Sequence, residues 1–197
     1  MESSHEKLDA AVRAVARLRL PVHAWRFEIR PWRAEVWAED DTRETLVAAG
    51  AAMFVLAVEL RVRGCAVSTE FLPGTGTPAL VGTVRLTGLR DPAGDDRELA
   101  AALGEPAPIH PPTEDDRRAL EVAAAVEGAR LCFPDPAHAW LCTRRDDRFA
   151  ELVAGLALAR VRLTAASRGV GLCWAEGTSA GEHVQAVLTV DQARVTP

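Results

Sequence analysis

Residues 42–64 read TRETLVAAGAAMFVLAVELRVRG, and this stretch decides the fold. Asp41 and Thr42 are residue types that favour the first position of a helix, and Gly64 is typical of the position after a helix. One long helix is therefore predicted to begin at Asp41 or Thr42 and to end at Gly64. From Leu46 to Val58 the residues are apolar on almost every side of this helix, not along one stripe. The apolar run is too short to cross a bilayer, so we expect a buried core helix and no membrane partner.

A second long helix is predicted to begin near Asp146 and to end at Gly169. Its apolar residues recur at spacings of three and four and so share one stripe: Phe149, Leu152, Leu156, Ala159, Leu163 and Ala166. Asp146 and Asp147 stand at its beginning, where carboxylates complement the helix dipole. Capping explains this acidic pair without any catalytic role.

The remaining segments predict shorter elements of both kinds. Helices are expected from Ser4, from Arg97 and from Thr113, where Asp116 completes a capping pattern. Alternating or short apolar runs predict strands in residues 24–29, 34–38, 65–72, 80–86, 129–133, 139–143 and 184–190. We therefore expect one α+β domain over residues 1–197, with an N-terminal helix in residues 1–20 and a flexible tail at residues 191–197.

Composition narrows the classes of partner. The chain has 197 residues, of which 48% are hydrophobic, which is enough for a core without disulfides or metals. Its net charge is −5 and no basic cluster is present, which argues against nucleic acid as a partner. A small-molecule ligand or another protein fits better. The first residues are polar and charged, unlike a secretory signal, so we expect a cytoplasmic protein.

The residue types that carry catalysis or bind metals are widely dispersed. The four cysteines, Cys65, Cys132, Cys142 and Cys173, lack the close pairs of zinc sites and are interpreted as buried, reduced thiols. His110, His138 and His183 have no partner at a spacing that is typical of a catalytic dyad or a metal site. We therefore expect no metal and name no catalytic residue.

Two short segments could bind a ligand. His23, Trp25 and Arg26 could form a corner that stacks on a planar ligand and holds its anionic group. The alternative is an ordinary hairpin strand in which Trp25 packs inward while Arg26 faces water. The second segment is Gly177-Thr178-Ser179, whose hydroxyls and backbone amides could contact a phosphate, although loops of this composition are common.

Two stretches resemble the Acg-type branch of the nitroreductase-like family found in actinobacteria. Residues 42–53, continuing to Arg63-Gly64 and to Phe71-Leu72-Pro73, are similar to a family segment with an "RE-L" start, a "GAAL" helix centre, a glycine end and a strand that finishes in "LP". The second stretch is similar to the family's strand and the "G-AL-R-LLTA" helix that follows it. It comprises residues 140–143 (WLCT), Asp146-Asp147 and residues 155–166 (GLALARVRLTAA). The resemblance implies a central, mostly antiparallel sheet packed with long apolar helices.

The same resemblance implies FMN as cofactor, but the flavin-binding motifs are degenerate. His23-Ala24-Trp25-Arg26-Phe27 resembles a remnant of the family's "HN-QPWRF" motif without its Asn and Gln-Pro. The arginine-rich "RR-T-R" segment is replaced by residues 104–110 (GEPAPIH). A flavin phosphate would lose cationic partners that each contribute about 1.5 to 3 kcal/mol.

Three hypotheses follow. The first is an FMN-binding NAD(P)H oxidoreductase that holds flavin with His23, Trp25, Arg26 and the loop of Gly177, Thr178 and Ser179, while the flavin performs the hydride chemistry. The second is a non-catalytic member that has lost FMN and acts as a structural, regulatory or ligand-binding protein. The third is a coincidental likeness, which predicts that the two long helices lie far apart. Since the chain is shorter than typical members, we expect it to bury its long helices in a homodimer.

Overall fold

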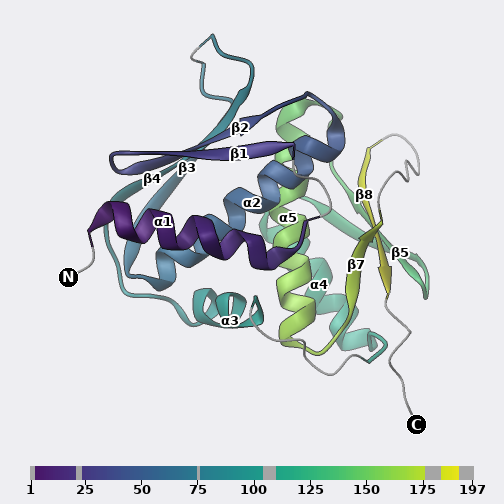
Figure 1. Ribbon diagram of the computed structural model, residues 1–197. Coiled ribbons are helices and arrows are strands. Elements are labelled where there is room, and N and C mark those ends of the chain that lie inside the picture. The colour runs from purple at the N-terminus through teal and green to yellow at the C-terminus, as the bar shows by residue number, and fades with distance from the viewer. Residues whose placement is uncertain (1–2, 21–23, 75, 104–109, 176–182, 191–197) are drawn as a thin grey trace.

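The computed structural model describes residues 3–20, 24–74, 76–103, 110–175 and 183–190. The helices in these ranges are α1 (Ser4–Val15), the short 3-10 helix η1 (Ala16–Leu18), α2 (Arg43–Val62), α3 (Gly94–Ala102), α4 (Glu114–Val126) and α5 (Arg148–Ser167). The strands are β1 (Trp25–Arg30), β2 (Arg33–Ala38), β3 (Cys65–Phe71), β4 (Leu80–Leu89), β5 (Arg130–Asp135), β6 (His138–Cys142), β7 (Leu172–Ala175) and β8 (Val184–Val190). Figure 1 shows their arrangement.

The strands form two four-stranded sheets, with the orders β1-β2-β4-β3 and β5-β6-β8-β7. Every pairing within these sheets is antiparallel. The first sheet covers α2, the second covers α5, and these two helices pack against each other in the middle (Figure 1). The predicted α+β class with antiparallel strands is confirmed. The expected central sheet is instead a pair of sheets with the long helices between them.

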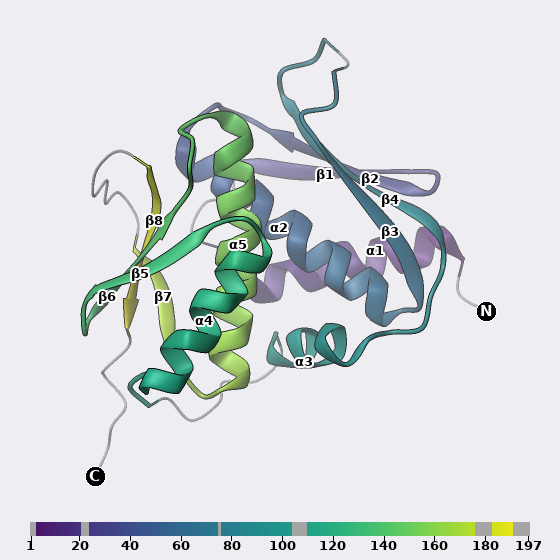
Figure 2. The same cartoon turned by 180° about the vertical axis from the view of Figure 1, so that it is seen from behind.

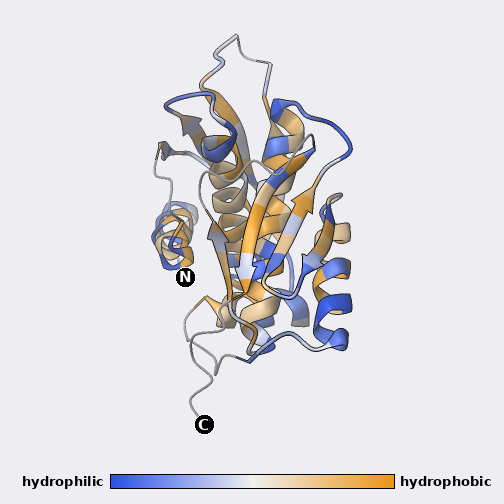
Figure 3. Cartoon of the chain, turned by 90° about the vertical axis from the view of Figure 1, so that its right-hand side faces the viewer, coloured by the Kyte–Doolittle hydropathy of each residue, from blue (hydrophilic) through white to orange (hydrophobic). Residues whose placement is uncertain are grey.

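Two apolar clusters explain why two sheets are needed. One cluster joins α1, α2 and the first sheet, and the other joins α4, α5 and the second sheet. Helix α5 contributes to both, with Leu152 and Leu163 in the first cluster and Leu158 and Val161 in the second. A helix that is apolar on opposite sides must be covered on both. In Figure 3 the strands facing the viewer are largely apolar, and the outer face of α4 beside them is hydrophilic.

The two long helices touch through glycines. A Cβ atom on Gly50 would lie 2.1 Å from the backbone oxygen of Leu152, and one on Gly155 would lie 2.1 Å from the backbone oxygen of Val47. No side chain fits at either position, so the backbones of α2 and α5 are in direct contact. The widely separated helices that a coincidental likeness predicts are not observed.

Helix α2 is a core helix. It is long and apolar enough to span a membrane by length and composition, but 89% of its most apolar window is buried inside the chain. Met53, Leu56 and Leu60 are fully buried without any second subunit. For α2, the expectation that a partner covers it is therefore wrong, because the first sheet and the other helices of the same chain cover it (Figure 2).

Local chemistry explains most element boundaries. The side chains of Thr42 and Asp147 accept hydrogen bonds from the first turns of α2 and α5, as predicted. The cap of α1 is Ser3 rather than Ser4, and it forms a capping box with Glu6. Strand β5 continues through Pro134, where a break was expected. Strand β5 lies at the edge of its sheet. Proline is tolerated in an edge strand, because its missing backbone N–H can face away from the neighbouring strand.

A polar cluster at the N-terminal ends of α2 and α5 joins them to the second sheet. Arg43 donates hydrogen bonds to Asp146 (2.8 Å) and to the carbonyl oxygen of Val184 (3.1 Å). The amide of Gln185 donates to the same carboxylate at 3.2 Å. Burial raises the pKa of the nearby Glu151, and the positive charge of Arg43 opposes that rise. Arg43 therefore fixes α2, α5 and β8 relative to one another.

Candidate functional site

Trp25 and Arg26 are consecutive residues of β1, so their side chains point to opposite faces of the first sheet. Trp25 packs against the first apolar cluster and meets the ring of Phe27 edge-on, with 5.3 Å between the ring centroids. The aromatic side chain therefore belongs to the inner face of the hairpin that β1 and β2 form.

Arg26 lies on the other face of β1. Its guanidinium forms an ion pair with Glu28 and lies over the ring of Trp37, 5.2 Å from the centroid. Glu28 also pairs with Arg30 at 2.7 Å. The arrangement matches the hairpin alternative, in which Trp25 packs inward and Arg26 faces solvent. If Trp25 stacked on a ligand and Arg26 bound the anionic group of the same ligand, both side chains would have to lie on the same face of the sheet.

The other predicted ligand contacts, His23, Gly177, Thr178 and Ser179, lie outside the described residues. Within the described part, a flavin phosphate at β1 would meet Arg26 only in competition with Glu28. The stacking ring of Trp25 would be on the opposite side of the strand. Trp25 and Arg26 by themselves therefore do not fit FMN.

The cysteines differ in exposure. Cys65 is buried, Cys132 and Cys142 are half-buried and Cys173 is exposed, and all four are free thiols. The free thiols agree with the prediction that the cysteines are reduced. The prediction that they are buried is correct for Cys65 alone. Among the described residues, no group of three His, Cys, Asp or Glu side chains is placed to hold a metal ion.

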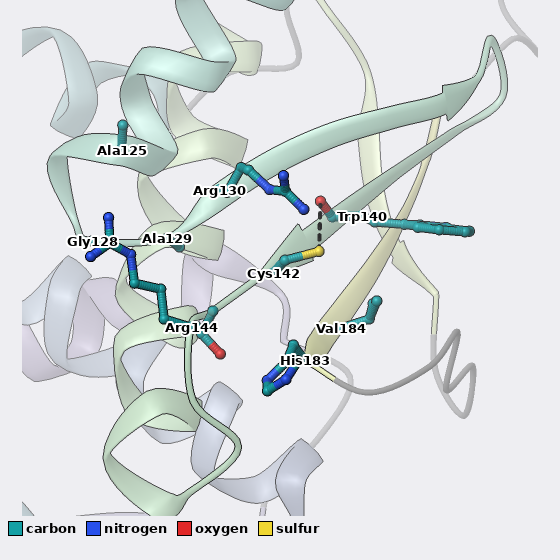
Figure 4. A pocket seen from close by; sticks show the side chains of 10 residues that line it. Ala125, Gly128, Ala129, Arg130, Trp140, Cys142, Arg144, His183 and Val184 are labelled. Carbon is teal, nitrogen blue, oxygen red and sulfur yellow. Dashed lines mark hydrogen bonds between the residues drawn. The ribbon is translucent and has the colours of Figure 1, made fainter.

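A groove that sequence reasoning missed lies beside the second sheet. It has a volume of about 930 Å³ and runs from the C-terminal end of α4 across the starts of β5 and β8 and the end of β6. Figure 4 shows its side chains, with Arg130, Arg144 and His183 approaching from different sides and Cys142 between them. These residues come from three separate segments, residues 125–130, 140–144 and 183–184, and form no motif, so the pairing of β5, β6 and β8 brings them together.

The thiol at the centre of this groove is uncharged. Burial raises the pKa of Cys142, and the neighbouring Cys132 raises it further, while Arg130 opposes both. The thiol donates weakly to the carbonyl oxygen of Trp140, at 4.0 Å. Because the pKa is raised, Cys142 is a neutral group at physiological pH and is poorly suited to nucleophilic chemistry.

Comparison with known proteins yields similarity in structure. No protein-family model and no curated protein matches the chain. In structure it is similar to a protein from Thermotoga maritima that carries the provisional name of nitroreductase, with a TM-score of 0.47 and 11% sequence identity. The superposition covers 96% of this chain and 93% of that one.

Proposed function

We propose that this chain is a nitroreductase-like protein of the Acg-type branch. The proposal is supported by the contact between Gly50 and Gly155, which come from the two separate stretches that carry the sequence resemblance. Alanine-rich helices that were alike only by chance would have no reason to meet at those two glycines. The long helices and their flanking strands are thus the part of the family pattern that this chain keeps.

On this frame we propose a flavin-free protein that serves as a ligand-binding or regulatory member. The supporting observation is the position of Arg26, which is paired with Glu28 on the face opposite Trp25. A flavin phosphate needs free cationic or amide donors, and the family's arginine-rich segment is replaced in residues 104–110. A cytoplasmic location and a homodimer of folded chains are part of this proposal.

An FMN-dependent NAD(P)H oxidoreductase is the second candidate. It is favoured by the remnant motif His23-Ala24-Trp25-Arg26. In that case FMN would supply the hydride chemistry, and the chain would contribute binding and orientation. Trp25 and Arg26 would have to be supplemented by His23 and by Gly177, Thr178 and Ser179.

An absorbance measurement distinguishes the two candidates. The purified protein is examined as isolated and again after incubation with FMN and gel filtration. We expect a colourless protein that releases added FMN. Retention of the visible flavin band would overturn the flavin-free proposal. The variants Trp25→Ala and Arg26→Gln would then test whether FMN is held at β1, with Arg118→Gln on the distant helix α4 as the control.

A further inference from the structure

The groove beside the second sheet has the size of a small-molecule site. Its volume of about 930 Å³ lies in the upper part of the range that is typical of ligand pockets. It is lined by both apolar and polar groups, among them Ala129, Val184 and Thr143. The Thr143 hydroxyl is already engaged, since it donates to the carbonyl oxygen of Arg145 and accepts from Gln185. Among the lining side chains, Arg130 and Arg144 carry the positive charge that could meet a ligand.

The charge in the groove is positive although the chain is acidic overall. Of the ten described residues that line it, none is an aspartate or a glutamate, and two are the arginines Arg130 and Arg144. Neither guanidinium forms an ion pair with any carboxylate in the part of the chain that the structure describes. By contrast, the adjacent Arg145 pairs with Asp147 at 2.5 Å. Two uncompensated positive charges thus face one hollow.

Among the described residues, neither the thiol of Cys142 nor the C-terminal end of α4 cancels this charge. The Cys142 thiol, next to Arg130, has a raised pKa and stays neutral. The C-terminal end of α4 carries about half a negative charge, which is less than the two full charges of the arginines. In addition, the carbonyl oxygens of Ala124 and Ala125 at that end accept backbone hydrogen bonds from residues 127–129. The described lining of the groove therefore carries a net positive charge.

We propose that this groove binds a small molecule through a phosphate or carboxylate group, with Arg130 and Arg144 as its cationic contacts. Guanidinium groups are suited to this role because their planar donors match the oxygens of either anion. The groove is formed by the second sheet and α4, whereas Trp25 and Arg26 belong to the first sheet. The site therefore does not share Trp25 or Arg26 with the flavin contacts predicted at β1.

Isothermal titration calorimetry tests the proposal with two probes, sodium pyrophosphate and sodium malonate, at an ionic strength held constant with chloride. Binding of pyrophosphate but not malonate would indicate a phosphate ligand, and the reverse a carboxylate ligand. We expect Arg130→Gln and Arg144→Gln each to weaken binding about tenfold, and the double variant to abolish it. Arg97→Gln removes an exposed arginine on α3, away from the groove, and should leave the affinity unchanged.

Three results would overturn the proposal. They are the absence of binding of either probe to the wild-type chain, equal binding to the double variant, and an equal loss in the Arg97→Gln control, which would indicate a general charge effect. Circular dichroism and thermal melting establish that the variants are folded. Arg144 is an exposed residue after the end of β6, so its single variant keeps the test valid if the double variant is unstable.

Discussion

Gly50 and Gly155 determine how closely the two central helices approach. A methyl group at either position would overlap a backbone oxygen at 2.1 Å, and backbone cannot move aside as a flexible side chain can. Alanine normally stabilises a helix interior by about 1 kcal/mol relative to glycine. Here we expect Gly155→Ala to lower the free energy of unfolding by at least about 2 kcal/mol, because overpacking outweighs propensity.

Urea unfolding measures this effect, with Gly94→Ala as the matched control. Gly94 also lies in a helix, but an added Cβ there would have nothing within 4 Å. The control should be neutral or slightly stabilising. Equal effects of the two substitutions would mean that the helices are not in backbone contact.

Asp116 connects the start of α4 to the end of α5. Burial would raise the pKa of this carboxyl, but hydrogen bonds from Thr113 and Arg168 outweigh burial and lower its pKa to about 2. An aspartate has an unfolded pKa of about 3.9, so its ionised form stabilises the fold above that pH. The stabilisation is lost as the pH falls from about 4 to about 2.

We therefore expect Asp116→Asn to lower stability at pH 7 by about 1 kcal/mol and to flatten the acid dependence below pH 4. Urea midpoints at neutral and acidic pH measure both effects. Glu114→Gln is the control, since Glu114 is exposed and should leave the acid dependence intact. If the stability of Asp116→Asn fell with pH as steeply as that of the wild type, Asp116 would not be the source of the acid dependence.

At the scale of elements, the boundaries that local chemistry determines could be predicted from sequence. A helix cap depends only on a side-chain oxygen that accepts a hydrogen bond from the backbone of the adjoining turn. Such caps are formed by Thr42, Thr113 and Asp147. The opposite directions of Trp25 and Arg26 also follow from strand alternation. The extension of β4 to Leu89 could not be predicted in this way, because its last residues pair with the start of β3 across the sheet.

Arg43 shows how elements are held together by a contact that no local pattern reveals. Its hydrogen bonds reach Asp146, just before α5, and the backbone of Val184 in β8. We expect Arg43→Met to destabilise the chain by about 1 to 3 kcal/mol, because it removes both hydrogen bonds and leaves the Asp146 carboxylate, among the described residues, with the amide of Gln185 alone. Arg118→Met removes an exposed ion pair with Glu114 and should change stability by less than about 1 kcal/mol. Urea unfolding of both variants decides whether the cluster is structural.

At the scale of the whole molecule, the sequence indicated a helix buried on all sides but not what surrounds it. Eight short strands can pair as one sheet or as two, and the choice depends on contacts between residues distant in the chain. The groove had no sequence signal for the same reason. Arg130 and Arg144 are separated by the β5–β6 hairpin, and His183 joins them only because β8 pairs with β6.

The burial of α2 inside one chain separates folding from assembly. Because Met53, Leu56 and Leu60 are already fully buried within the chain, a homodimer would join folded subunits. We expect light scattering to detect dimers at high protein concentration and the far-ultraviolet circular dichroism to stay unchanged when dilution separates them. The melting temperature should likewise depend only weakly on concentration. Loss of the helical signal on dissociation would show that the subunits need each other to fold. Contacts between subunits, made by surfaces other than the long helices, would then be essential to the fold.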